Sequence, residues 1–311
     1  MGSDKQNSEL TKWEENEKQK QEEELAKVEV WKYVFGFVEM AVVKCAIELG
    51  IADAIESHGR AMTVQELSST LGCASQTLHR VMRFLANRGI FREEHVTPPN
   101  DDVASKRYAQ TPLSRRFMRT GEGSMAALLL VESSPPMLAP WQALSARVAG
   151  GGAPAPFDAA NGEDLWRYGA ANSEHSRLFN EAMACSARVT VAAVIEGCLD
   201  VFDGVGSVVD VGGGTGTALR MLVEACRPRI RGVNFDLPHV VADAEECEGV
   251  EHVGGDMFEF VPKADAAFLM VSVNINSFIH THICFIFIYF FKICLYILLF
   301  HTLTVRIFLN F

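Results

Sequence analysis

A glycine-rich turn directly after a short apolar run is the segment of this chain best suited to chemistry. Residues 205–209 are mostly apolar and predict a buried strand, and residues 210–216 then read DVGGGTG. Glycines allow a sharp turn from the strand into a helix, predicted to begin near Thr217, and let the backbone approach a ligand closely. The N–H groups at the start of that helix face such a ligand. The segment predicts a loop that binds a nucleotide-type cofactor; the alternative is a tight structural turn.

The spacing of the glycines favours one class of cofactor over another. Gly212, Gly214 and Gly216 give G-x-G-x-G preceded by Asp210, whereas the fingerprint for dinucleotides is G-x-G-x-x-G. A dinucleotide is therefore disfavoured.

Acidic residues follow the next two predicted strands. The run 230–235 is strand-like and ends at Asp236, where Leu237-Pro238 stops the strand. An acid at this position binds a ribose diol. The run 250–253 ends in Gly254-Gly255-Asp256-Met257, so that Asp256 could accept a hydrogen bond from an adenine amine while Met257 packs on the ring. Together the three strand ends predict a nucleoside-containing cofactor.

These segments carry a resemblance to a known family. VVDVGGGTG, GVNFDLPHV and GVEHVGGDMFEFVPKADAAFLM resemble the S-adenosylmethionine domain of plant small-molecule O-methyltransferases, the group that includes caffeic acid and flavonoid O-methyltransferases. The likeness extends from about Val30 to Met270. It implies an α/β protein in which a helical, winged-helix-like dimerisation domain precedes a Rossmann-like class I methyltransferase domain.

The resemblance also implies a cofactor and its contacts. The cofactor is S-adenosylmethionine, and the family's contacts to it correspond here to Gly212, Asp236, Asp256 and Met257. From the loop itself we add two further candidate cofactor-binding residues, Asp210 and Gly214. No metal is expected.

A helix segment resembles the part of the family that lines the substrate pocket. Phe179, Asn180 and Met183 match the family's F-N-x-x-M pattern, whose Phe and Met line a phenolic pocket. Read from spacing alone, Phe179 and Met183 are an i, i+4 pair that would pack in a core. The resemblance implies transfer of a methyl group to a phenolic hydroxyl of a plant secondary metabolite.

The likeness stops at Met270. The family continues into a W-x-L-H-D-W-like segment whose His takes the phenol proton, and residues 271–311 contain no such segment. His280 and His282 lie outside any matching motif, so no catalytic residue is assigned. We therefore expect a methyltransferase domain truncated at its fourth strand and a chain without activity.

Two interpretations of the apolar tail, residues 271–311, remain. The tail has no Gly, Ala, Pro, Asp or Glu, as translated T-rich intron sequence would, and Val271-Ser272 is what an in-frame splice donor encodes. The other interpretation is a membrane span over 283–300, which has about the necessary length. Lys292 near its centre counts against a span, since a central Lys costs about 2.5 to 3.5 kcal/mol on insertion scales. We favour the intron.

Composition bounds the remaining possibilities. The chain has 311 residues, is 49% hydrophobic, and carries 28 basic against 39 acidic residues, for a net charge of −11. This size allows about two domains, and the negative charge disfavours a polyanion as partner. The eight cysteines lack the spacing of metal ligands and predict reduced thiols in a cytoplasmic protein.

The amino-terminal half predicts helices and suggests a rival function. Residues 28–49 are almost continuously apolar, as in a buried helix, and a partner subunit would be a suitable cover. Thr63 and Glu66 match a capping box, and a second helix from Ser75 is followed by a strand-like Ile90-Phe91. This helix–turn–helix order also occurs in DNA-binding regulators, where His79, Arg80 and Arg83 would face the groove; the acidic charge argues against it.

The expected organisation has five parts. They are a charged extension (1–27), a winged-helix-like dimerisation domain (28–120), a helical linker with substrate-lining residues (121–200), a truncated Rossmann-like domain (201–270) and the apolar tail (271–311). The expected partners are a phenolic small molecule and a second subunit, either a copy of this chain or an intact paralogue. In the latter case the chain would act as a non-catalytic interaction protein.

Overall fold

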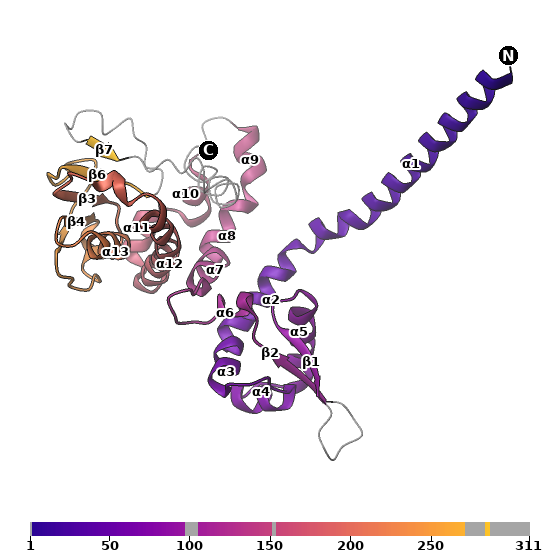
Figure 1. The fold of residues 1–311 in the computed structure, drawn as a ribbon, viewed down its shortest axis with the longest axis horizontal. Helices are drawn as coiled ribbons and strands as arrows, with labels where there is room; N and C mark the ends of the chain where they lie inside the picture. Colours follow the sequence, from indigo (N-terminus) through magenta and orange to yellow (C-terminus); the bar gives the residue numbers. More distant parts are fainter. Residues whose placement is uncertain (1, 97–104, 151–153, 271–283, 287–311) are drawn as a thin grey trace.

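The chain folds into an amino-terminal helical part and a carboxyl-terminal α/β part, in a computed structural model that describes residues 2–96, 105–150, 154–270 and 284–286 (Figure 1). The amino-terminal part contains helices and one antiparallel hairpin. Its elements are α1 (Gly2–Val34), α2 (Gly36–Leu49), α3 (Ile51–His58), α4 (Val64–Leu71), α5 (Ser75–Asn87), β1 (Arg92–Val96), β2 (Ser105–Ala109) and α6 (Pro112–Arg115).

Helices α4 and α5 form as their sequences predict. The Thr63 hydroxyl accepts a hydrogen bond from the Glu66 N–H at 3.1 Å, and the Glu66 carboxylate accepts one from the Thr63 N–H at 2.7 Å. This reciprocal pair satisfies two free donors at the start of α4. In α5, Leu78, Met82 and Leu85 recur on one helix face and are buried in the core of this part. The strand-like Ile90-Phe91 is buried in the same core but lies just before β1.

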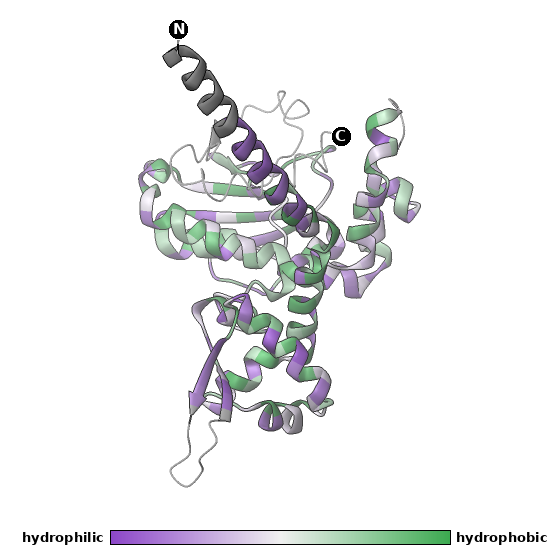
Figure 2. Ribbon diagram, turned by 90° about the vertical axis from the view of Figure 1, so that its right-hand side faces the viewer, coloured by the Kyte–Doolittle hydropathy of each residue, from purple (hydrophilic) through white to green (hydrophobic). Residues whose placement is uncertain are grey.

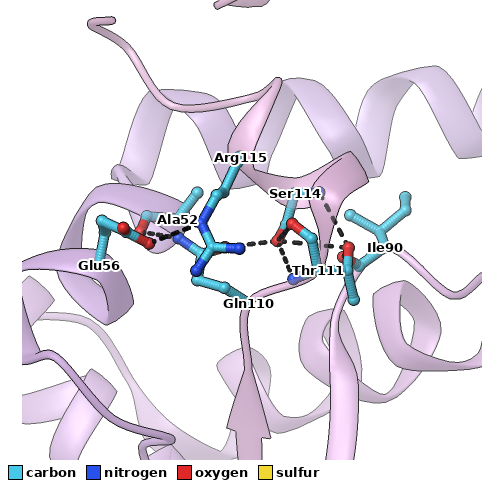
Figure 3. A network of polar contacts seen from close by, with 7 residues as sticks. All are labelled: Ala52, Glu56, Ile90, Gln110, Thr111, Ser114 and Arg115. Carbon is cyan, nitrogen blue, oxygen red and sulfur yellow. Dashed lines mark hydrogen bonds and ion pairs between the residues drawn. The ribbon is translucent and has the colours of Figure 1, made fainter. Parts of the chain in front are cut away.

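A polar network ties the end of the hairpin to the surrounding helices (Figure 3). The Gln110 amide donates to the Ala52 carbonyl of α3 at 2.6 Å, and the Thr111 hydroxyl donates to the Ile90 carbonyl at 2.6 Å. The Ser114 hydroxyl is fully buried and bonds to Gln110. These hydrogen bonds give the polar side chains of Gln110, Thr111 and Ser114 partners where the chain leaves β2.

Helix α1 projects away from the rest of the chain, and its ribbon is mostly hydrophilic where it is coloured (Figures 1 and 2). Its last turns and the start of α2 are different, because large apolar side chains there are half exposed or more. Trp31 stacks on Phe35 with ring centroids 5.7 Å apart. The exposed large hydrophobic residues of this segment are Val28, Val30, Trp31, Tyr33, Val34, Phe35 and Phe37. The predicted burial of 28–49 is thus found within the chain only in the later part of α2.

The carboxyl-terminal part begins with short helices and contains a parallel sheet. Its helices are α7 (Ala126–Glu132), α8 (Pro135–Gln142), α9 (Leu144–Ala149), α10 (Pro156–Asn161), α11 (Leu165–Ala171), α12 (Ser173–Gly197), the 3₁₀ helix η1 (Leu199–Phe202), α13 (Thr217–Cys226) and α14 (Pro238–Val241). Its strands are β3 (Ser207–Val211), β4 (Arg231–Asp236), β5 (Val250–Gly254), β6 (Ala266–Phe268) and β7 (Cys284–Ile286).

The five strands are all parallel, in the order β5-β4-β3-β6-β7. Successive side chains of β3 point to opposite faces, so that Val208 packs with α12 and α13 while Val209 packs in a second cluster with Phe235. The strand order reverses at β3, and ligands of doubly wound sheets bind at the carboxyl ends of the strands beside such a reversal. The glycine loop follows β3 at this point.

Helix α12 is, among the described residues, the one helix long and apolar enough to cross a membrane. It packs against α7 and α13, and Cys185, Val191 and Val194 are buried in these contacts. This is the environment of a core helix. Of the predicted span 283–300, the structure describes only Cys284–Ile286, which form a strand beside β6; the remainder lies outside the described residues.

Candidate functional site

The glycine loop turns from β3 into α13 through left-handed backbone conformations. Gly212, Gly214 and Gly216 have backbone φ angles of 74°, 59° and 82°, which residues other than glycine rarely adopt. The Gly212 N–H donates to the Phe235 carbonyl of β4 at 2.8 Å. A Cβ placed on Gly212 or Gly214 would have no atom within 4 Å, so this side of the loop is open to a ligand.

Gly213 faces the interior and leaves no room for a side chain. A Cβ placed on it would lie 2.2 Å from the Asn234 Oδ1 atom and 2.7 Å from the Asp210 Cγ atom. Real Cβ atoms do not approach neighbours this closely. The loop therefore rests directly on the side chains of Asn234 and Asp210.

Asp236 lies at the end of β4 and contacts the glycine loop. Its Oδ2 atom accepts a hydrogen bond from the Gly214 N–H at 2.7 Å, and its Oδ1 atom accepts one from the Leu237 N–H at 2.7 Å. Burial raises the pKa of Asp236, and these two backbone hydrogen bonds act in the opposite direction. Since a carboxylate oxygen can accept more than one hydrogen bond, Asp236 can still bind ligand hydroxyls. The structure thus brings two predicted site residues, Gly214 and Asp236, into direct contact.

Asp256 and Met257 follow β5 at the same edge of the sheet. The Gly255 N–H donates to the Asp236 carbonyl at 2.9 Å, which ties this segment to the end of β4. Met257 is partly buried against the apolar cluster that contains Phe235. Asp256 is exposed, and its Oδ1 atom accepts from the Phe258 N–H at 2.8 Å. Both residues therefore lie beside the end of β4, and their contacts with adenine stay a prediction.

Asp210 is placed differently from the other candidate residues. Its side chain is 1% exposed, and its Oδ2 atom has no hydrogen-bond partner. Burial, with a smaller contribution from the nearby Asp236 carboxylate, raises the pKa of Asp210 to about 7. The residue supports the loop from beneath, whereas the open side of the loop is formed by Gly212 and Gly214.

The predicted substrate-lining residues belong to an aromatic cluster between α11 and α12. Phe179 and Met183 are partly buried against a core that includes Phe157. Trp166 is 53% exposed and meets Phe179 edge-on, with ring centroids 6.4 Å apart and an interplanar angle of 87°. Phe179 and Met183 thus pack on the core, as their spacing alone suggests, and both keep some exposed surface that a ligand could contact.

Two polar atoms in this region have no partner. The Nε2 atom of His175 and the Nδ2 atom of Asn180 are buried and make no hydrogen bond. The His175 ring lies 5.1 Å from Tyr168 and 6.4 Å from Phe179 between centroids, and burial lowers its pKa. Buried polar atoms normally have partners, so these two are suited to a ligand that brings hydrogen-bonding groups.

The residues at the sheet edge fit S-adenosylmethionine. The open backbone at Gly212 and Gly214 admits a ligand, Asp236 offers carboxylate oxygens for the ribose diol, and the N-terminus of α13 has no side-chain cap. The net positive charge of the cofactor also suits a site bordered by two carboxylates, Asp236 and Asp256.

Sequence reasoning missed two polar residues of the site. Asn234 on β4 is fully buried, and its Nδ2 atom donates to the Gly214 carbonyl at 2.9 Å. His252 on β5 lies with its Nδ1 atom 3.1 Å from that same amide. Both belong to the strands that precede the predicted acids. Each has apolar residues on one or both sides, Val233 and Phe235 around Asn234 and Val253 after His252, and this was the available signal.

The face suggested for DNA binding carries an open hollow of about 420 Å³. It is bordered by the starts of α4 and α5 and by β2, with His79 and Lys106 among its lining residues. His79, Arg80 and Arg83 are exposed on α5, and none of them contacts the sheet-edge site. The hollow gives no support to nucleic-acid binding beyond the exposure of these side chains.

Comparisons with known proteins agree on one family. The chain matches the family model of an O-methyltransferase domain over residues 141–281, past Met270 where the resemblance read from the sequence ends. It matches the O-methyltransferase dimerisation domain over residues 31–120.

Individual relatives extend over most of the chain. Acetylserotonin O-methyltransferase of Arabidopsis thaliana is 47% identical over 266 residues, which are 83% of this chain and 68% of the relative. Flavonoid 7-O-methyltransferase 1A of Mentha piperita is 42% identical over 252 residues, covering 80% and 70%. The structure of human N-acetylserotonin methyltransferase in complex with SAM has the same fold, with a TM-score of 0.68 at 19% identity, over 78% of this chain and 70% of that one.

Replacing Gly213 with Ala is expected to abolish binding of S-adenosylmethionine. The new Cβ would overlap Asn234 and Asp210 and displace the loop. A matched control is Gly169→Ala in α11, where a Cβ meets no atom within 4 Å, so binding should be retained. Isothermal titration calorimetry on both variants, with circular dichroism to verify folding, makes the test. Unchanged affinity in folded Gly213→Ala would contradict this account of the loop.

Proposed function

Since the chain belongs to the O-methyltransferase family, we propose that its fold serves the transfer of a methyl group from S-adenosylmethionine to a phenolic hydroxyl of a plant secondary metabolite, and that this chain retains the cofactor-binding part of that function. The observation that carries the proposal is the contact between the Gly214 N–H and the Asp236 carboxylate beside an open glycine loop. The names of the Arabidopsis and Mentha relatives, an acetylserotonin and a flavonoid O-methyltransferase, support an aromatic hydroxyl as acceptor.

The chain's own residues would bind and orient the two reactants. The cofactor, when bound, supplies an activated methyl group. Asp236 would accept hydrogen bonds from the ribose, Gly212 and Gly214 would let the backbone approach the cofactor, and Met257 would pack on the adenine. Holding the methyl donor and the acceptor oxygen in line accounts for much of the rate in such a transfer.

The aromatic cluster supports an aromatic substrate with polar substituents. Phe179 and Trp166 are exposed enough to contact a ring, and Met183 lies one helical turn from Phe179. The unpaired Nε2 atom of His175 and Nδ2 atom of Asn180 would hydrogen-bond to groups on that ring. Removing such partners from a buried polar atom is costly, so the same atoms would select against a purely apolar ligand.

The 311-residue chain is proposed to bind the cofactor without transferring its methyl group. Residues 271–311 contain no segment resembling W-x-L-H-D-W, which the resemblance identifies as the source of the general base. The general base of that motif is therefore missing from residues 271–311, and we assign its role to no other residue of the chain.

Equilibrium binding and a methyl-transfer assay test this proposal together. The purified 311-residue chain should bind S-adenosylmethionine, and Asp236→Ala should weaken binding about tenfold or more, because hydrogen bonds to a charged group are lost. The exposed Asp243→Ala is the matched control and should bind normally. No radiolabelled methyl should pass to N-acetylserotonin or to flavonoids. Methyl transfer by this chain would contradict the proposal that it is inactive. Failure to bind S-adenosylmethionine would contradict the proposal that the chain is built for this cofactor.

A second copy of this chain is the proposed cover for the apolar surface of α1 and α2. The match to the O-methyltransferase dimerisation domain begins at residue 31, within that surface. Trp31, Phe35 and Phe37 are more than half exposed, and exposed apolar patches of this kind mark interaction sites. Pairing with an intact paralogue would use the same surface.

Changing Val34 to Glu is expected to convert the dimer into a monomer, because it places a charge in the covered surface. Val148→Glu on α9 is the matched control, since Val148 is 69% exposed and lies far along the chain from this surface. Sedimentation or light scattering at several protein concentrations measures the mass. A wild-type chain that is monomeric at all concentrations, or a Val34→Glu chain that still dimerises, would contradict the proposed homodimer.

A further inference from the structure

Three polar side chains form a row beneath the glycine loop. Asp210 on β3 pairs in register with Asn234 on β4, and Asn234 pairs in register with His252 on β5. Register partners on neighbouring parallel strands point to the same face of the sheet. Asp210 and Asn234 are 1% and 0% exposed, so the row begins in the interior and reaches the surface at His252.

The hydrogen bonds of Asn234 fix the orientation of its amide. Its Nδ2 atom is 2.9 Å from the Gly214 carbonyl, which can only accept, so this atom is the nitrogen. The second hydrogen on Nδ2 is directed to the His252 Nδ1 atom at 3.1 Å.

The state of His252 follows from its two contacts. Its Nδ1 atom must accept from Asn234, so Nδ1 carries no hydrogen. Its Nε2 atom is 3.1 Å from the Glu245 carbonyl and donates to it. These contacts are those of the tautomer with its hydrogen on Nε2, and each ring nitrogen has one partner.

The other end of the row has two acceptors and no donor. The Oδ1 atom of Asn234 and the Oδ2 atom of Asp210 are both buried without a partner. Both lie against Gly213, since a Cβ built there would be 2.2 Å from the first and 2.8 Å from the second. Two buried oxygens that only accept are each unpaired. A hydrogen on Asp210 would turn one of them into a donor for the other.

We propose that Asp210 is held as the neutral carboxylic acid and donates a hydrogen bond to Oδ1 of Asn234, completing a chain through Asn234 and His252 that positions the glycine loop. The role of this chain of hydrogen bonds in positioning the loop rests on the proposed function, since that loop is the proposed cofactor site. Asn234 holds the Gly214 carbonyl while Asp236 holds the Gly214 N–H, so this one residue of the loop is fixed from two sides. Asp210, Asn234 and His252 are thus positioning residues for the cofactor site.

The charged groups around Asp210 are consistent with this state. Burial and the Asp236 carboxylate both raise the pKa of Asp210, to about 7, against about 3.9 for an ordinary aspartate. A hydrogen bond donated by the acid raises this pKa further. Among the ionisable groups on the neighbouring elements, His252 of β5 accepts a hydrogen bond from Asn234, and His239 of α14 acts to lower the pKa of Asp236.

A direct titration of the carboxyl group tests the proposal without cofactor. In the full chain labelled with ¹³C at aspartate carboxyls, the resonance missing from Asp210→Asn should remain that of a neutral acid at pH 6. The infrared difference between the two proteins at that pH should show the carbonyl band of the acid as well. An Asp210 carboxyl that is ionised at pH 5 would overturn the proposal, whether or not the chain binds S-adenosylmethionine.

Melting temperatures give a second test with a conservative variant. Asp210→Asn keeps an N–H that can donate to Asn234, whereas Asp210→Ala leaves Asn234 Oδ1 unpaired, so only the Ala variant should be markedly destabilised. Because the folded pKa is raised, the stability contributed by Asp210 is full below its unfolded pKa and is lost as pH rises through about 7. The wild-type melting temperature should therefore fall over this range relative to that of Asp210→Asn. Equal damage by both variants, or parallel pH profiles, would contradict the hydrogen bond.

The positioning role is tested at the far end of the row. His252→Phe removes the acceptor for Asn234 and should weaken binding of S-adenosylhomocysteine about tenfold, the effect of losing roughly one hydrogen bond. His79→Phe, at an exposed histidine of α5, is the matched control and should bind normally. Normal affinity in a folded His252→Phe would show that the row does not position the loop.

Discussion

The close contact between Gly213 and the strands beneath it is the constraint on which the site depends. Because no side chain fits at this position, the loop can lie directly on Asp210 and Asn234, and its other side stays open at Gly212 and Gly214. That placement brings the Gly214 N–H within 2.7 Å of Asp236. The parallel register of β3, β4 and β5 then fixes where Asn234, Asp236 and His252 lie.

The substrate side depends on a different part of the chain. Helix α12 packs against α7 and α13, and it carries Phe179, which meets Trp166, and Met183 one helical turn further on. The cofactor loop and this helix are connected through the cluster that joins α12, α13 and β3. A shift of α12 would thus alter both the ring contacts and the support of the sheet.

The sequence predicted the fold class, which the structure has, and it placed candidate site residues at the ends of strands, because both predictions depend on local signals. Glycines at the end of an apolar run required a turn, and acids before Pro238 and Met257 marked the strand ends. It did not reveal the side on which Asp210 lies, since a one-residue change in strand register reverses the face of a side chain. The same difficulty hid Asn234 and His252, whose importance arises from pairing between strands.

In the amino-terminal part too, features set within one helix could be predicted, and features set by contacts with other parts could not. The capping box at Thr63 and the buried face of α5 follow from spacing within one helix, and both were predicted. The exposed Trp31 and Phe37 look like core residues in the sequence, and the single chain leaves them uncovered. Burial that comes from a second subunit has the same apolar pattern as burial within one chain.

The most direct test of the central claim is to observe the loop glycines while cofactor product is added. In the full chain labelled with ¹⁵N-glycine, addition of S-adenosylhomocysteine should shift the amide resonances of Gly212 and Gly214 and leave that of Gly59 in the dimerisation domain unchanged. Loop resonances that stay in place at saturating ligand, or shifts confined to other glycines, would contradict the assignment of this turn as the cofactor site.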